Sequence, residues 1–181
     1  MPFGLIIGAF SRSAGKAADR FGPRPFLTAG ALLVFLACSG LALGLANFWI
    51  GAVLPILLLS AGMAAAVSPL TTAVMNAVPD SLSGAASGVN NAASRLAGLF
   101  AVAVLGLVAE LVFSGAAPAG ARFGVLPEPD GPGRAAIEAA FVSAYTGAMA
   151  VAALWALLAA FCSFLLLRGT GGSSDRGRVS L

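Results

Sequence analysis

Five charged side chains could carry chemistry in this sequence. Asp19, Arg20 and Arg24 lie close together in a basic stretch, while Arg95 and Glu110 interrupt long apolar runs. A carboxylate and a guanidinium group so near each other can form an ion pair, and an ionisable group inside an apolar run can bind an ion or a proton. The chemistry to consider is therefore ion pairing and ion or proton binding, and it depends on the elements that position these groups.

The composition argues against a soluble protein and against most enzymes. Of the 181 residues, 59% are hydrophobic and 9% are charged, whereas soluble domains carry about 25% charged residues. There is no His, and the two Cys lie far apart, which disfavours a zinc site, a disulfide scaffold and a Ser-His-Asp triad. We expect a membrane protein with no enzymatic activity, no cofactor, no metal and no bound nucleic acid, whose first partner is the lipid bilayer.

Four apolar stretches are long enough to cross a bilayer. No ionisable residue occurs between Pro25 and Val78, and one helix of that length would rise about 80 Å across a hydrocarbon core of about 30 Å. The break between two spans is expected at Ala46–Trp49, where an amide precedes two aromatic residues of the interfacial type. The sequence predicts an all-α membrane bundle with spans near 26–45, 50–73, 86–113 and 139–167.

The start of the chain differs from these spans. Phe3–Phe10 is apolar for eight residues, about 12 Å of helix, which is too short to cross. The basic residues follow this run instead of preceding it, so it is not a secretory signal. We interpret it as the last half of a helix whose beginning is missing; a short interfacial or re-entrant segment at a true N-terminus is the alternative.

The basic residues predict how the chain is oriented. The loop at 11–25 holds four cations and the chain from Arg168 onward holds three, whereas the loop at 114–135 holds two. Four spans place the first loop and the tail on one side, and the positive-inside rule assigns that side to the cytoplasm. The membrane we expect is the inner (plasma) membrane of the cell. The predicted divisions are a helix remnant at 1–10, a cytoplasmic loop at 11–25, three helices within 26–113, an external loop at 114–135, the last helix at 136–168 and a disordered tail at 169–181.

The basic loop carries an ordered motif. Residues 15–25 read Gly-Lys-Ala-Ala-Asp-Arg-Phe-Gly-Pro-Arg-Pro. This pattern resembles the signature loop of the major facilitator superfamily, in which the Asp and Arg form an ion-pair network with a neighbouring helix end and switch between transporter states. The resemblance implies a conformational switch made of Gly15, Asp19, Arg20, Gly22 and Arg24, thinned where Pro23 replaces a second basic residue. A plain cluster of cations that anchors to anionic head groups is the alternative.

The third span opens with a polar stripe beside a stripe of small residues. Ser83, Ser87, Asn91 and Arg95 are spaced by four and share one helical face. Small residues on the adjacent face allow close packing of transmembrane helices. The candidates for packing or for lining a cavity are Gly84, Gly88, Asn90, Asn91, Arg95 and Gly98. The segment looks like the penultimate helix of the EmrB/QacA-type drug:proton antiporters, which have fourteen helices.

Arg95 and Glu110 each have two interpretations. Arg95 either faces a cavity beside the two asparagines or reaches the inner interface. Glu110 lies fifteen residues further along the chain, about 22 Å away on a helix, so the two cannot pair. Glu110 is either interfacial or a protonation site.

The resemblance implies the C-terminal portion of a proton-coupled multidrug efflux protein, inactive by itself. Its partners would be the missing N-terminal helices and, in the whole transporter, protons and a small hydrophobic or cationic substrate. A sugar or metabolite permease of the same superfamily is one alternative. A small non-transporting membrane protein that forms oligomers or binds a membrane partner is the other.

Overall fold

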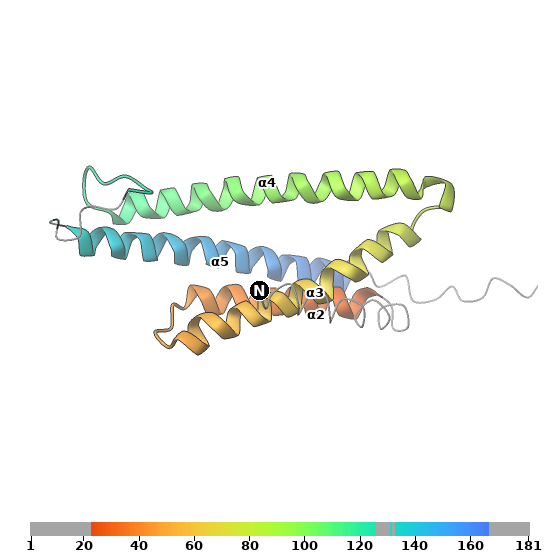
Figure 1. Cartoon of the computed structure of the whole chain (residues 1–181), viewed down its shortest axis with the longest axis horizontal. Helices are drawn as coiled ribbons and strands as arrows, with labels where there is room; N and C mark the ends of the chain where they lie inside the picture. The colour runs from red at the N-terminus through yellow and green to blue at the C-terminus, as the bar shows by residue number, and fades with distance from the viewer. Residues whose placement is uncertain (1–22, 126–130, 132, 167–181) are drawn as a thin grey trace, which may run out of the picture.

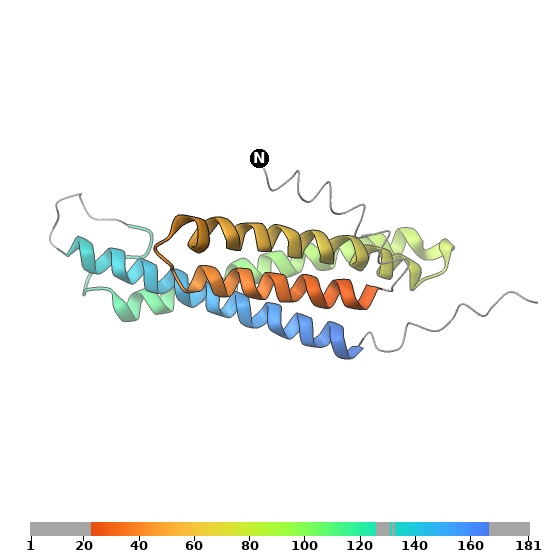
Figure 2. The same ribbon diagram turned by 90° about the horizontal axis from the view of Figure 1, so that it is seen from below.

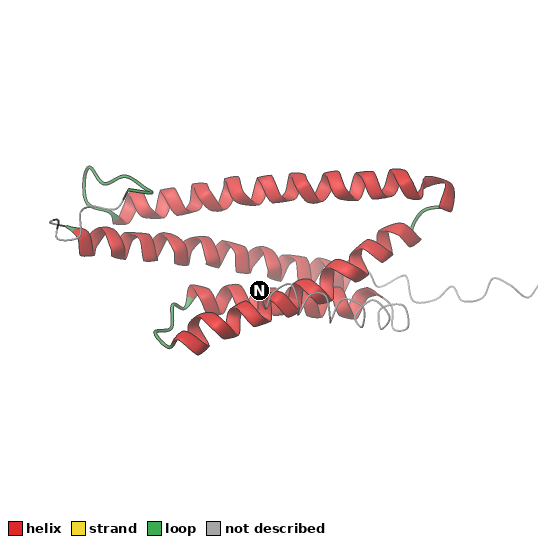
Figure 3. Ribbon diagram, in the orientation of Figure 1, coloured by secondary structure: helices red, strands yellow, loops and turns green. Residues whose placement is uncertain are grey.

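The protein is a bundle of four long helices. The computed structural model describes residues 23–125, 131 and 133–166, and no strand occurs among them (Figure 3). Each long helix is apolar and long enough to cross a membrane. In chain order the elements are α2 (Pro23–Ala42), the π-helical turn η1 (Trp49–Val53), α3 (Leu54–Asn76), the 3₁₀ turn η2 (Asp80–Leu82), α4 (Ser83–Ala116) and α5 (Arg134–Leu166).

Four predicted spans are confirmed as four apolar helices, with shifted ends. The last two helices are longer than predicted, since α4 begins at Ser83 and ends at Ala116, and α5 begins at Arg134. The connection between them is therefore 117–133 instead of 114–135. The predicted helix remnant at 1–10, the loop residues 11–22 and the tail at 169–181 lie outside the described residues.

Successive helices alternate in direction, and α2 lies between α3 and α5 (Figures 1 and 2). This alternation gathers the start of α2, the α3–α4 turn and the end of α5 at one end of the bundle, on the right in Figure 1. The connection after α2 and the connection between α4 and α5 lie at the other end. Helix α4 packs against α5 and touches α3 where the two are joined.

Helices α2 and α3 approach each other through two glycines. A Cβ atom added to Gly30 would lie 2.8 Å from the carbonyl oxygen of Gly62, and one added to Gly62 would lie 2.7 Å from that of Gly30. Any larger residue would push the two backbones apart, as is usual where small residues mediate close packing in membranes. Further along, Gly40 faces the ring of Pro55, whereas Gly44 lies in the following turn with a φ of +58°.

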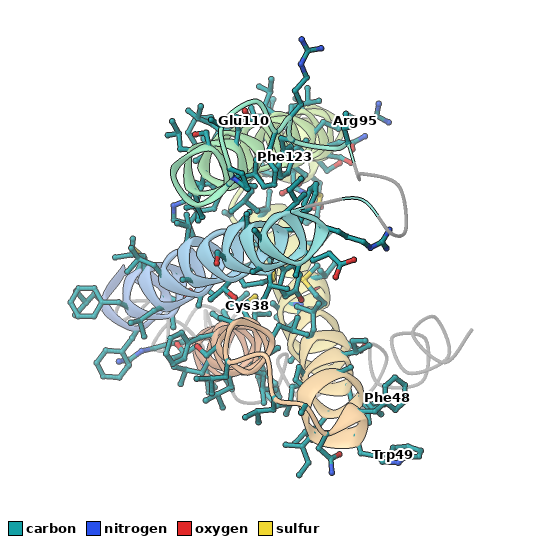
Figure 4. The ribbon with its side chains drawn as sticks, turned by 90° about the vertical axis from the view of Figure 1, so that its left-hand side faces the viewer. Cys38, Phe48, Trp49, Arg95, Glu110 and Phe123 are labelled. Carbon is teal, nitrogen blue, oxygen red and sulfur yellow. The ribbon has the colours of Figure 1, made fainter. Side chains whose placement is uncertain are left out.

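The break between α2 and α3 falls at the predicted residues and has a specific cap. The Oδ1 atom of Asn47 accepts hydrogen bonds from the backbone N–H groups of Trp49 (3.0 Å) and Ile50 (3.3 Å), which would otherwise lack helical partners. The π turn that follows leads into Pro55, which has no N–H to donate. The rings of Phe48 and Trp49 are exposed and point away from the bundle (Figure 4), as interfacial aromatic residues do.

Helices α4 and α5 are joined by a small aromatic core at the end of the bundle away from the α3–α4 turn. Phe113 is buried against Ala140 and Ala144, and its ring lies 4.7 Å from that of Phe141 and 5.4 Å from that of Phe123. Phe123 belongs to the connection between the helices, so part of this connection folds back onto them. Most of α4 from Ser83 to Phe100 is exposed by comparison.

Candidate functional site

Arg24 joins the first turn of α2 to the last turns of α5. Its Nε atom donates a hydrogen bond to the carbonyl oxygen of Phe164 (3.1 Å), and its Cζ atom lies 4.4 Å from the centre of the Phe164 ring. This carbonyl lies in the last turn of α5 that the structure describes, which reaches Leu166. Arg24 therefore joins α2 to α5 through one backbone carbonyl and one ring.

Arg24 is the one residue of the predicted switch loop that falls in the described part of the chain. Its partners are the backbone carbonyl and the ring of Phe164 in α5. The other predicted members, Gly15, Asp19, Arg20 and Gly22, lie outside the described residues. Their roles stay predictions.

A groove runs between α2 and α5 beneath Arg24. One cavity of about 400 Å³ is lined by Arg24, Pro25, Thr28, Ala29, Leu32 and Phe164. A second of about 200 Å³ shares three of these residues and adds Leu157, Ala160 and Phe161 from α5. The surface of both is almost entirely carbon. The hydroxyl oxygen of Thr28 is buried and has no hydrogen-bond partner among the described residues.

Sequence reasoning identified Arg24 but neither its partner nor this groove. Phe164 is 140 residues away in sequence, and an aromatic residue near a helix end carries no signal of a distant arginine. The four-residue spacing of Arg24, Thr28 and Leu32 was the available clue, since it places them on one face of α2.

The polar and small stripes of α4 are exposed. A Cβ atom added to Gly84, Gly88 or Gly98 would meet nothing within 4 Å in the described residues. Asn91 and Arg95 are exposed, and Asn90 is half-buried, with its carbonyl oxygen accepting a hydrogen bond from the Ser94 hydroxyl (2.8 Å). Within this chain, the stripes therefore face no neighbouring helix that the structure describes.

Arg95 and Glu110 lie apart on α4 and point away from the rest of the bundle (Figure 4). Both side chains are exposed, and no ion pair involves either among the described residues. An ion pair does form at the start of α5, where Arg134 Nε lies 2.7 Å from Glu138 Oε1. Among all the residues that the structure describes, no group of His, Cys, Asp or Glu side chains could hold a metal ion.

Comparison with known proteins adds no relative. No family model, curated protein or solved structure matches the chain significantly. The described residues form four apolar helices, and Arg24 of α2 contacts Phe164 of α5 at one end of the bundle.

Proposed function

We propose that this chain forms part of a proton-coupled drug exporter of the major facilitator type, with the Arg24 end of the bundle facing the cytoplasm. The observation that carries the proposal is the bond from Arg24 to the end of α5. The ordered motif that leads into α2 resembles a switch loop, and the one described arginine of that motif binds a backbone carbonyl of a neighbouring helix. A cluster of cations that served only to orient the chain would need no such partner.

The strength of this contact suits a switch. A hydrogen bond from a charged group contributes about 1.5–3 kcal/mol, and a cation–π contact at an exposed site contributes about 0.5–1 kcal/mol. Conformational equilibria in proteins commonly involve a few kcal/mol. Loss of the contact would shift such an equilibrium without unfolding the bundle.

The exposed stripes of α4 support a place in a larger bundle. Asn91 and Arg95 would be costly if they faced lipid within the hydrocarbon core. Glycines with open space beside them offer a surface onto which another helix could pack closely. We propose that N-terminal helices of the exporter cover this face, with substrate and protons moving between the two parts.

The first test is the size of the native product. An epitope tag fused after Leu181 at the native locus should label a membrane protein several times larger than 17.8 kDa. The chain expressed alone in an efflux-deficient host should give no gain in drug tolerance. Clear tolerance from the chain alone would contradict the proposal.

The second test is the effect of Arg24 on efflux by that product. Arg24→Gln should lower drug tolerance several-fold at equal expression, and Arg24→Lys should retain part of it, because the charge remains while the stacked, planar group is lost. Arg122→Gln is the matched control, since Arg122 is an exposed cation in the α4–α5 connection at the opposite end. Equal tolerance in all four proteins would remove Arg24 from the switch.

A second candidate is favoured by the same exposed face of α4. A small membrane protein could pair with a second copy through Gly84 and Gly88, which are open to a partner. A native band near 17.8 kDa would favour this candidate. Gly88→Cys in a background without Cys38 and Cys162 should then give a disulfide-linked dimer, whereas Val102→Cys on the exposed surface of the same helix should give far less.

A further inference from the structure

The groove between α2 and α5 extends from one end of the bundle towards its middle. The two cavities share Thr28, Leu32 and Phe164, so they form one continuous strip. Arg24 and Leu32 are eight residues apart on α2, which corresponds to about 12 Å along the helix axis. The strip therefore begins at a helix terminus, where the bilayer interface lies, and runs into the hydrocarbon region.

The lining is apolar with one cation at its outer end. No carboxylate of the described residues lines either cavity. Arg24 offers five N–H groups, of which one is bonded to Phe164. The remaining N–H groups have no protein partner among the described residues. A ligand that complements this strip needs an anionic group at one end and a hydrocarbon chain behind it.

Thr28 lines both cavities one helical turn inward from Arg24. Its hydroxyl oxygen is buried and closed off from the groove, so a ligand in the groove does not reach it. Among the described residues, the polar contact that this strip offers to a ligand is therefore Arg24.

We infer that this groove binds one anionic phospholipid. The phosphate lies on Arg24, and an acyl chain packs along Leu32, Leu157 and Phe161. A free phosphate would leave the apolar strip uncovered, and a lipid without net charge would balance the cation less well. The site goes beyond the proposed transport function and does not depend on it.

The test measures lipid bound to the purified full chain in detergent by native mass spectrometry. Phosphatidylglycerol should bind about fivefold more tightly than phosphatidylcholine with the same acyl chains, as expected for one interfacial cation. Arg24→Gln should abolish this preference, and Arg122→Gln should leave it unchanged. Arg24→Lys keeps the charge and should keep most of the preference. This variant provides the comparison with wild type if the Gln variant fails to fold.

A second pair of variants tests the apolar strip. Ala29→Phe fills the larger cavity while keeping Arg24, and should weaken binding of both lipids. Ala103→Phe adds the same bulk on the exposed surface of α4 and should weaken neither.

Three results would overturn the inference. Equal binding of the two lipids would mean an unselective apolar surface. Displacement of phosphatidylglycerol by millimolar inorganic phosphate would mean an anion site without a lipid. Failure of lipid to bind, together with photo-crosslinking from position 29 to another polypeptide, would mean that a helix of that polypeptide occupies the groove.

Discussion

At the scale of single residues, two polar side chains make specific contacts with helix backbones in the described part of the protein. Arg24 in α2 donates a hydrogen bond to a backbone carbonyl of α5, and Asn47 caps the start of the helix that contains α3. Asn47 could be found from the sequence, because its partners are two and three residues away. The partner of Arg24 could not, because a contact across 140 residues is set by tertiary packing that no local pattern encodes.

Replacement of Asn47 tests the cap. Asn47→Ala should lower the free energy of unfolding by about 1 kcal/mol, because two backbone N–H groups lose their acceptor. The loss of helical circular dichroism during titration of detergent-solubilised protein with sodium dodecyl sulfate measures this change. Asn47→Ser keeps an acceptor and should stay near wild type; equal losses in both variants would show that the side-chain oxygen does not stabilise the helix.

At the scale of elements, hydropathy predicted the four helices but not which surfaces pack. The small stripe of α4 was a packing candidate, yet it is open within the described residues, while α2 and α3 approach each other closely at Gly30 and Gly62. Glycine content alone marks a position where close approach is possible. Which glycines are used depends on the helix that lies opposite, and a single sequence does not state this.

A paired glycine substitution tests this difference. Gly62→Val should destabilise the bundle by about 1–3 kcal/mol, because the added side chain meets the backbone of α2. Gly98→Val, made on the open surface of α4, should change stability by a few tenths of a kcal/mol, since valine is a somewhat better helix former than glycine. Denaturant titration followed by circular dichroism compares the two. Similar losses would place the packing surface of α3 elsewhere.

At the scale of the whole molecule, the aromatic core is one of the contacts that attach α4 to α5. The rings of Phe113, Phe123 and Phe141 contact one another where α4, α5 and their connection meet. The sequence predicted this connection as an external loop. The return of Phe123 onto the helices was not predicted, because loop composition does not indicate where a single aromatic side chain packs.

Loss of the Phe123 ring tests the attachment. Phe123→Ala should cost about 1–3 kcal/mol, since each aromatic pair contributes about 0.5–1.5 kcal/mol beyond its buried area. Limited proteolysis should then cut the α4–α5 connection several-fold faster. Val125→Ala in the same connection, at an exposed residue, should leave the cleavage rate unchanged. Equal acceleration in both variants would mean that the ring does not hold the connection in place.

The length of α4 has a consequence for water and lipid. Its 34 residues rise about 51 Å, and even a tilt of about 40° leaves about 39 Å to be placed across a hydrocarbon core of about 30 Å. Since the apolar residues lie towards Ala116, the surplus falls at the Ser83 end. If α4 crosses a bilayer, its first turns therefore lie outside the hydrocarbon core, at the level of the head groups, where helical hydrogen bonds and not acyl chains protect their amide protons from exchange.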